Sequence, residues 1–245
     1  MSKTSSRVSI DSERIRLSAK YKYLIMPIEP SVFIDSLRQI GFSPLPSAPK
    51  PPIGSGISFA LVGPVAQKGQ NRIDLDLGRG IIAVEGINSS EVLADFQAVD
   101  LILKDQFSLD LQTKTWFVEA ISEVTLTSNR SAIDSIRALF SDSALYSAIG
   151  NVMGDVPTTF GLRLGRHESN PIDEDWFDFK IEPVVHNPTS YYISIVYRNP
   201  ARLKVYNFVK ALEEKLQALV MVVEGPSKNP KLLGTTKTKN HRISS

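Results

Sequence analysis

The clearest pattern in this sequence is the strict alternation of apolar and charged residues along 72–77. The apolar positions are Ile73, Leu75 and Leu77, and the polar positions are Arg72, Asp74 and Asp76. Because successive side chains of an extended chain point to opposite faces, this pattern predicts a strand with one buried face and one solvated face. A tight turn at Leu77-Gly78-Arg79-Gly80 leads into a second strand over 80–85.

Two longer segments repeat their apolar residues at helical spacing, over 89–104 and 201–220. Asn88 with Glu91 three residues later resembles a capping box, which predicts that the first of these helices begins there. Asn199-Pro200 predicts the beginning of the second helix in the same way, because proline is favoured at the first helical position.

The remaining patterns give the same order of elements twice. Strand-like runs cover 21–29, 57–62, 72–77, 80–85, 116–126, 158–164, 176–181 and 191–197, and further helices are predicted after Pro30 and after Asn129 or Ser131. A loop is expected around Gly150 and Gly154. The sequence therefore predicts an α+β fold of two pseudo-repeated strand–helix–three-strand–helix units, with an antiparallel sheet covered by helices on one face.

These units give boundaries along the chain. We expect a flexible basic segment over 1–19, a first α+β half over 20–110, a second half over 111–225 and a disordered basic tail over 226–245.

A duplication would pair specific elements of the two halves. Strand Ile73–Leu77 would correspond to Phe177–Ile181, with Phe177, Phe179 and Ile181 as the matching inward residues. The helices over 89–104 and 201–220 would also correspond. They would lie on the same side of the sheet, related by an approximate twofold axis.

The segment Arg72–Asp105 resembles the second part of a TATA-box-binding-protein repeat. The shared features are a strand, a turn containing glycine, a strand that ends in Gly86 and a capped helix. This resemblance implies a saddle with one continuous sheet below and the helices above. It does not extend to DNA binding, because the outward residues of the paired strands include Asp74, Asp76, Asp178 and Glu182, and carboxylates repel phosphate.

Composition removes several classes of chemistry. The chain has 245 residues and no cysteine, so disulfides, thiol catalysis and cysteine-ligated metals are excluded. We find no apolar run approaching about 18 residues and no signal-peptide pattern over 1–16, so a cytoplasmic protein that does not enter membranes is expected. No histidine pair has metal-ligand spacing, and no cofactor or metal is expected.

Charge is distributed unevenly along the chain. The last twenty residues carry five cations and no acid, and residues 1–22 also carry a net positive charge, so the body between them is acidic. The tail cations are Lys228, Lys231, Lys237, Lys239 and Arg242. They predict either weak, nonspecific nucleic-acid binding or simply a solubilising terminus.

One motif suggests catalysis. Leu61-Val62-Gly63-Pro64, followed after nine residues by Asp74-Leu75-Asp76, resembles a nucleotidyltransferase signature whose two aspartates share Mg²⁺. This alternative requires a helix directly after Gly63. Pro64 removes a backbone donor, and residues 65–73 are more typical of a hairpin.

Aromatic residues are concentrated on two predicted strands of the second half. Trp176 and Tyr192 are predicted to point away from the core and to offer a contact surface. Because no convergent catalytic constellation accompanies them, the first hypothesis is a non-catalytic binding or assembly protein. Its partner would be another protein or a second copy, met through the sheet face or the helix faces.

Overall fold

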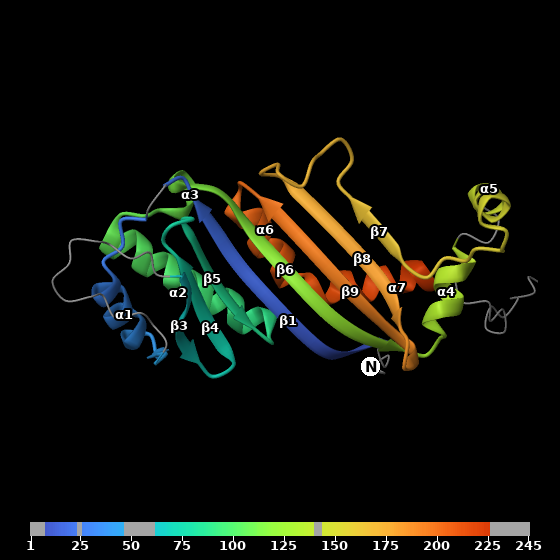
Figure 1. Cartoon of the computed structure of the whole chain (residues 1–245). Coiled ribbons are helices and arrows are strands. Elements are labelled where there is room, and N and C mark those ends of the chain that lie inside the picture. Colours follow the sequence, from blue (N-terminus) through green and yellow to red (C-terminus); the bar gives the residue numbers. More distant parts are fainter. Residues whose placement is uncertain (1–7, 24–25, 47–61, 140–143, 226–245) are drawn as a thin grey trace, which may run out of the picture.

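The computed structural model describes residues 8–23, 26–46, 62–139 and 144–225. Within these ranges nine strands form one antiparallel sheet in the order β2-β3-β4-β5-β1-β6-β9-β8-β7 (Figure 1). The strands are β1 Val8–Tyr21, β2 Ser43–Pro44, β3 Val62–Lys68, β4 Asn71–Asp76, β5 Ile81–Gly86, β6 Thr115–Ser128, β7 Leu162–Gly165, β8 Trp176–Val184 and β9 Asn187–Asn199. The helices are α1 Pro30–Gln39, α2 Ser89–Phe107, α3 Leu111–Lys114, α4 Ala132–Ala138, α5 Ala144–Met153, α6 Arg202–Lys210 and α7 Leu212–Glu224.

The centre of the sheet is the pair of long strands β1 and β6. They run antiparallel from Val8 opposite Ser128 to Tyr21 opposite Thr115. Outward from β1 come β5, β4 and β3, and outward from β6 come β9, β8 and β7. The predicted counterparts β4 and β8 therefore occupy the same place on the two sides of the centre. The origin of this symmetry in a duplication stays a prediction.

The main helices lie on one face of the sheet, which confirms the predicted α+β class. α2 packs on β1 and β5, α6 packs on β6 and β9, and α2 and α6 contact each other. Figure 1 shows α2, α6 and α7 together behind the sheet. The buried side chains between these layers include Ile15, Leu17, Ile73, Phe96 and Ile193.

Local signals explain where several helices begin. Asn88 Oδ1 accepts the backbone N–H of Glu91 at 3.0 Å, as the capping pattern predicts. Pro30 is the first residue of α1, where its missing N–H costs nothing, and Gly41 follows the helix with a φ of +90°.

Sequence predictions for the first strand and for the loop around Gly150 were wrong. Residues 8–19, expected to be a flexible segment, belong to the central strand β1. The strand expected over 21–29 overlaps β1 only at Tyr21. The loop expected around Gly150 is in fact helix α5. The predicted strand over 57–61 and most of the proline-rich loop lie outside the described residues.

Candidate functional site: an apolar groove beside α6 and α7

An open groove runs between the outer strands of the second half and the helices α6 and α7. Its volume is about 1010 Å³. The side chains that line it are largely apolar: Leu139, Leu162, Leu164, Phe177, Phe179, Ile195, Tyr197, Phe208, Ala211, Ala218, Leu219, Val222 and Val223, together with Lys204, Asn207 and Lys215.

Strand alternation places the floor of the groove. Phe177 and Phe179 on β8 point to the helix-covered face, and Leu162 and Leu164 on β7 point the same way. Phe179 is buried, whereas Phe177 keeps 37% of its surface exposed. The prediction that Phe177 belongs to the core is therefore wrong, because none of the described helices covers this end of β8.

The wall of the groove contains a stacked aromatic pair. The rings of Tyr197 on β9 and Phe208 on α6 lie 4.4 Å apart at an interplanar angle of 15°. Burial raises the pKa of the Tyr197 hydroxyl, and the nearby Asp175 adds to this effect. This half-buried, stacked pair gives the groove an aromatic wall.

The charges at the groove are all of one sign. Lys204 and Lys215 are exposed, and no carboxylate is among the lining residues. Lys215 Nζ lies 6.0 Å from the centre of the Phe208 ring. Among the described residues no ion pair involves Lys204 or Lys215. The groove therefore favours an apolar occupant that brings negative charge to its rim.

The two halves differ in how their outer strands are covered. In the first half, α1 packs on β2, β3 and α2, and it buries Phe33 and Leu37. In the second half, the seven-residue α4 packs on β8, β9 and α7. The next helix, α5, buries none of its residues and stands away from the sheet (Figure 1). The groove exists because none of the helices in the described ranges covers β7 and the outer part of β8.

The segment proposed for Mg²⁺ chemistry has a different geometry from the one that chemistry needs. β3 and β4 pair antiparallel, with Gly63 opposite Leu75 and Pro64 opposite Asp74, so residues 62–76 form a hairpin. The helix required directly after Gly63 is absent. Pro64 lacks the N–H that a phosphate-binding turn would use.

The two aspartates are held by protein cations and backbone. Asp74 pairs with Arg16 and with Arg72. Asp76 accepts the backbone N–H of Arg79 at 2.8 Å, which closes the turn to β5. In the described part of the chain no group of three histidine or acidic side chains could hold a metal ion.

Asp74 and Asp76 lie on the face of the sheet opposite the helices, as predicted. We call this the open face, and many ion pairs lie on it. The pairs are Arg14–Glu85, Arg16–Asp74, Arg72–Glu85, Arg198–Glu119, Arg163–Asp178 and Lys180–Glu182. Cations and carboxylates thus neutralise each other across neighbouring strands. Such a face lacks the uniformly basic footprint of a surface that binds a phosphate backbone.

Trp176 and Tyr192 also lie on the open face, but the structure does not bring them together. Trp176 is opposite Arg198, and Tyr192 is opposite Glu182. Arg198 and Tyr192 are six positions apart on β9, a distance of roughly 20 Å along a strand. The Trp176 ring lies close over Gly165, and Lys180 Nζ lies 6.0 Å from the Tyr192 ring. The predicted aromatic contact surface is therefore not a single patch.

The structure does not describe the cations predicted to bind nucleic acid. Lys228, Lys231, Lys237, Lys239 and Arg242 lie outside the described residues. No helix in the described ranges is both long and apolar enough to cross a membrane. Comparison of the chain with known protein families, with curated proteins and with solved structures found no match.

Sequence reasoning missed the groove although it identified several residues that line it. Phe177, Phe179, Leu219 and Tyr197 were all assigned to strands or to the final helix. The sequence did contain one signal of the groove, namely that the second half has fewer amphipathic helices than its apolar strands need as cover. The second half has apolar strands and an amphipathic helix over 201–220, but between 140 and 160 it offers no amphipathic helix with a charged outer face.

Proposed function

We propose that this chain is a non-catalytic binding and assembly protein whose contact surface is the apolar groove. One observation carries the proposal: a groove of about 1010 Å³ on the helix-covered face, lined by side chains of three strands and two helices. Large exposed apolar surfaces on monomeric proteins are uncommon, and they mark interaction sites.

The shape and chemistry of the groove favour a helical polypeptide as the occupant. The groove follows α6 and α7 between Lys204 and Val223, and a helix that lies beside other helices presents its own apolar stripe to such a surface. Phe177, Phe208 and Leu219 supply large apolar contacts, while Lys204 and Lys215 can pair with acids at the edge of the occupant.

Fewer observations support nucleic-acid binding. Nonspecific nucleic-acid binding would have to come from the tail cations, because the open face of the sheet pairs its charges internally. The likeness to a TATA-box-binding-protein repeat is a proposal about architecture, namely a continuous sheet with helices on one side. We propose no DNA-contacting residue from it.

A labelled helical peptide tests the groove as a binding site. The probe carries leucine on one face and glutamate on the other, and a scrambled version carries the same residues without a stripe. We expect the striped peptide to raise the fluorescence anisotropy on titration into dilute protein. Ala218→Asp should weaken this binding at least about tenfold, because Ala218 is exposed and lines the groove.

The control is Met221→Asp, which adds the same charge to an exposed position of α7 outside the groove lining. It should leave the affinity for the striped peptide unchanged. Equal weakening by both variants, equal binding of the scrambled peptide or no binding of the striped peptide would refute the proposed function.

A further inference from the structure

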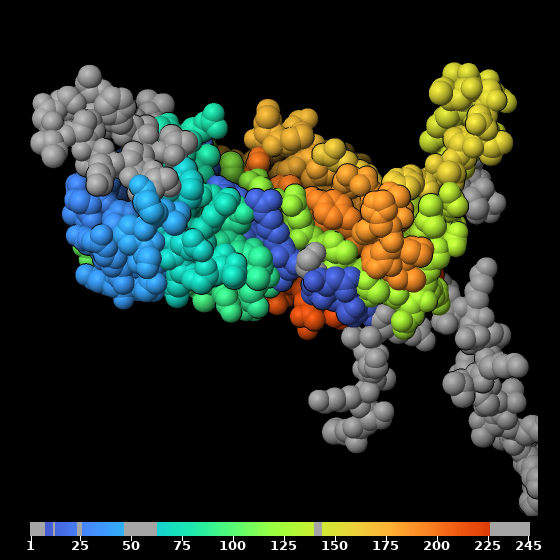
Figure 2. Space-filling view, turned by 60° about the horizontal axis from the view of Figure 1, so that its bottom comes forward, coloured from blue at the N-terminus to red at the C-terminus, as the bar shows by residue number. Residues whose placement is uncertain are grey.

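Helix α5 is an arm whose apolar side chains stay exposed in the part of the chain that the structure describes. None of its ten residues is buried. Its large exposed apolar side chains are Leu145, Ile149, Val152 and Met153, and Val152 keeps 84% of its surface exposed. Figure 2 shows this helix, in yellow, standing clear of the body of the molecule. Short helices in water depend on tertiary packing, so a surface that covers these exposed apolar side chains would stabilise α5.

The apolar side chains of α5 form one stripe. Positions 149, 152 and 153 lie four, seven and eight residues after position 145, so all four fall within about 100° of the helix circumference. We name this set the α5 stripe. Ser147, Gly150 and Asn151 lie on other faces of the helix, where they line a second cavity of about 930 Å³.

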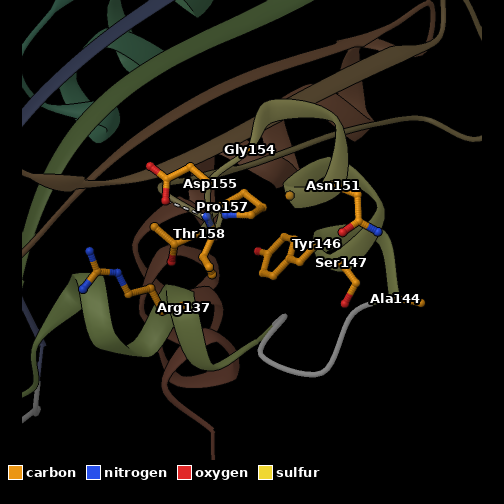
Figure 3. A pocket seen from close by; sticks show the side chains of 11 residues that line it. Arg137, Ala144, Tyr146, Ser147, Asn151, Gly154, Asp155, Pro157 and Thr158 are labelled. Carbon is orange, nitrogen blue, oxygen red and sulfur yellow. Dashed lines mark hydrogen bonds between the residues drawn. The ribbon is translucent and has the colours of Figure 1, made fainter.

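The face of α5 away from the stripe is held by its own chain. The N–H of Gly154, which has a φ of +72°, donates to the carbonyl of Gly150 at 2.8 Å, and the chain then turns back along the helix. A Cβ atom at Gly150 would lie 3.0 Å from the carbonyl oxygen of Asp155 and 3.3 Å from Pro157, so glycine permits this close approach. Tyr146 points from α5 toward Pro157 and Thr158 (Figure 3). The arm is thus braced while its stripe stays exposed.

The α5 stripe and the groove have complementary size and charge. The ten residues of α5 span about 15 Å, which is shorter than the stretch of α6 and α7 that lines the groove. α5 contains no charged residue, whereas its C-terminal end carries the negative pole of the helix and is followed by Asp155. That end matches the groove, whose lining includes Lys204 and Lys215 and no acid.

Building on the proposed function, we propose that the occupant of the groove is α5 of a second copy of this chain. No residue of α5 lines the groove of its own chain. Each copy carries one arm and one groove, so two copies can exchange their arms reciprocally. The two equal contacts then close a twofold dimer and leave no free arm or groove. In the first half, α1 covers the outer strands β2 and β3. The groove lies over the outer strands of the second half, so the exchanged helix would supply the cover that is missing there.

Sedimentation of two single variants and of their mixture tests this exchange. Val152→Asp puts a charge in the stripe, and Ala218→Asp puts one in the groove; both positions are exposed, so the monomer fold is expected to persist. We expect the wild-type chain to dimerise. Each variant damages both reciprocal contacts and should raise the dimer dissociation constant at least about a hundredfold, or about tenfold per contact.

The mixture is the decisive sample. A Val152→Asp chain still has an intact groove, and an Ala218→Asp chain still has an intact arm, so the mixed dimer regains one whole contact. Its other contact carries both aspartates, but a contact that one aspartate has already broken loses little more from the second. We expect it to form at concentrations where each variant alone is monomeric. Asn151→Asp and Met221→Asp carry the same charge beside these positions, and they should dimerise like the wild type.

The outcomes separate this inference from the proposed function. A wild-type chain that stays monomeric, or a mixture no more associated than its components, overturns the exchange. If the striped peptide still binds the groove in that case, the groove remains a binding site for another partner or for the arm of the same chain. If the peptide also fails to bind, the proposed function fails with it.

Discussion

Replacing Leu75 with aspartate is expected to lower the free energy of unfolding by at least about 4 kcal/mol, because it buries a charge without a partner. Leu75 is 1% exposed and lies between Ile73 and Leu77 on the helix-covered side of the hairpin. A loss of that size approaches the whole stability of many domains, so the variant should be largely unfolded. Urea unfolding followed by circular dichroism measures the effect.

The matched control is the neighbouring residue on the other face. Asp76→Asn keeps an oxygen that can accept the N–H of Arg79, and the side chain is partly exposed, so we expect a change within about 0.5 kcal/mol. A larger loss for Asp76→Asn than for Leu75→Asp would mean that the two faces of β4 are assigned the wrong way round.

Glu85→Gln is expected to cost about 2 kcal/mol at neutral pH. Glu85 is 8% exposed, and its carboxylate accepts hydrogen bonds from Arg14 at 2.8 Å, from Arg72 at 3.2 Å and from Arg16 at 3.3 Å. Glutamine keeps one acceptor oxygen but replaces the other by an amide NH2, which would face the guanidinium groups as a donor, and their shared negative charge is lost. The cost lies between that of an exposed ion pair and that of a buried one, because Arg14 and Arg72 keep about half of their side-chain surface in water.

The effect of Glu85→Gln should depend on pH. Burial alone would raise the pKa of Glu85, but Arg14, Arg72 and Arg16 outweigh it, and the pKa is lowered. The folded protein therefore releases this proton more readily than the unfolded chain. The stabilisation by Glu85 is complete above the unfolded pKa of about 4.3 and is lost as the pH falls through the folded pKa.

Unfolding curves of wild type and Glu85→Gln at pH 7 and near pH 3 measure this dependence. The difference between the two proteins should shrink at the lower pH. A constant difference at both pH values would show that the Glu85 charge is not responsible.

The sequence predicted elements whose local signals agree with their tertiary surroundings. The alternation at Ile73, Leu75 and Leu77 gave the correct buried face of β4. The Asn88 cap and Pro30 gave the correct beginnings of α2 and α1. In each case the signal is a local steric or hydrogen-bonding requirement, and the fold satisfies it without competition.

Strand β1 was missed because its outward residues are charged. Ile15, Leu17 and Ala19 alternate with Arg14 and other polar residues, which made the segment read as a basic terminus. The charges are tolerated there because the neighbouring strands supply Glu85 and Asp74 as partners. That pairing depends on strand order, which a single stretch of sequence does not encode.

The groove and α5 were missed for a different reason. Gly150 reads as a loop residue, yet in the structure it allows Asp155 and Pro157 to pack against a helix. The groove depends on the absence, among the described helices, of one that covers β7 and the outer part of β8. Phe177 alternates like a core residue, and only the arrangement of α4 and α5 decides that it stays exposed.

Cross-linking between single cysteines tests most directly whether the groove receives α5 from a second copy. The chain has no natural cysteine, so Val152→Cys in one copy and Ala218→Cys in another provide a unique pair of thiols. After mild oxidation of the mixture, the account predicts a disulfide-linked heterodimer. It should form much faster than in a control mixture of Asn151→Cys and Met221→Cys, whose positions lie outside the stripe and the groove. Equal rates of cross-linking in the two mixtures would contradict the account.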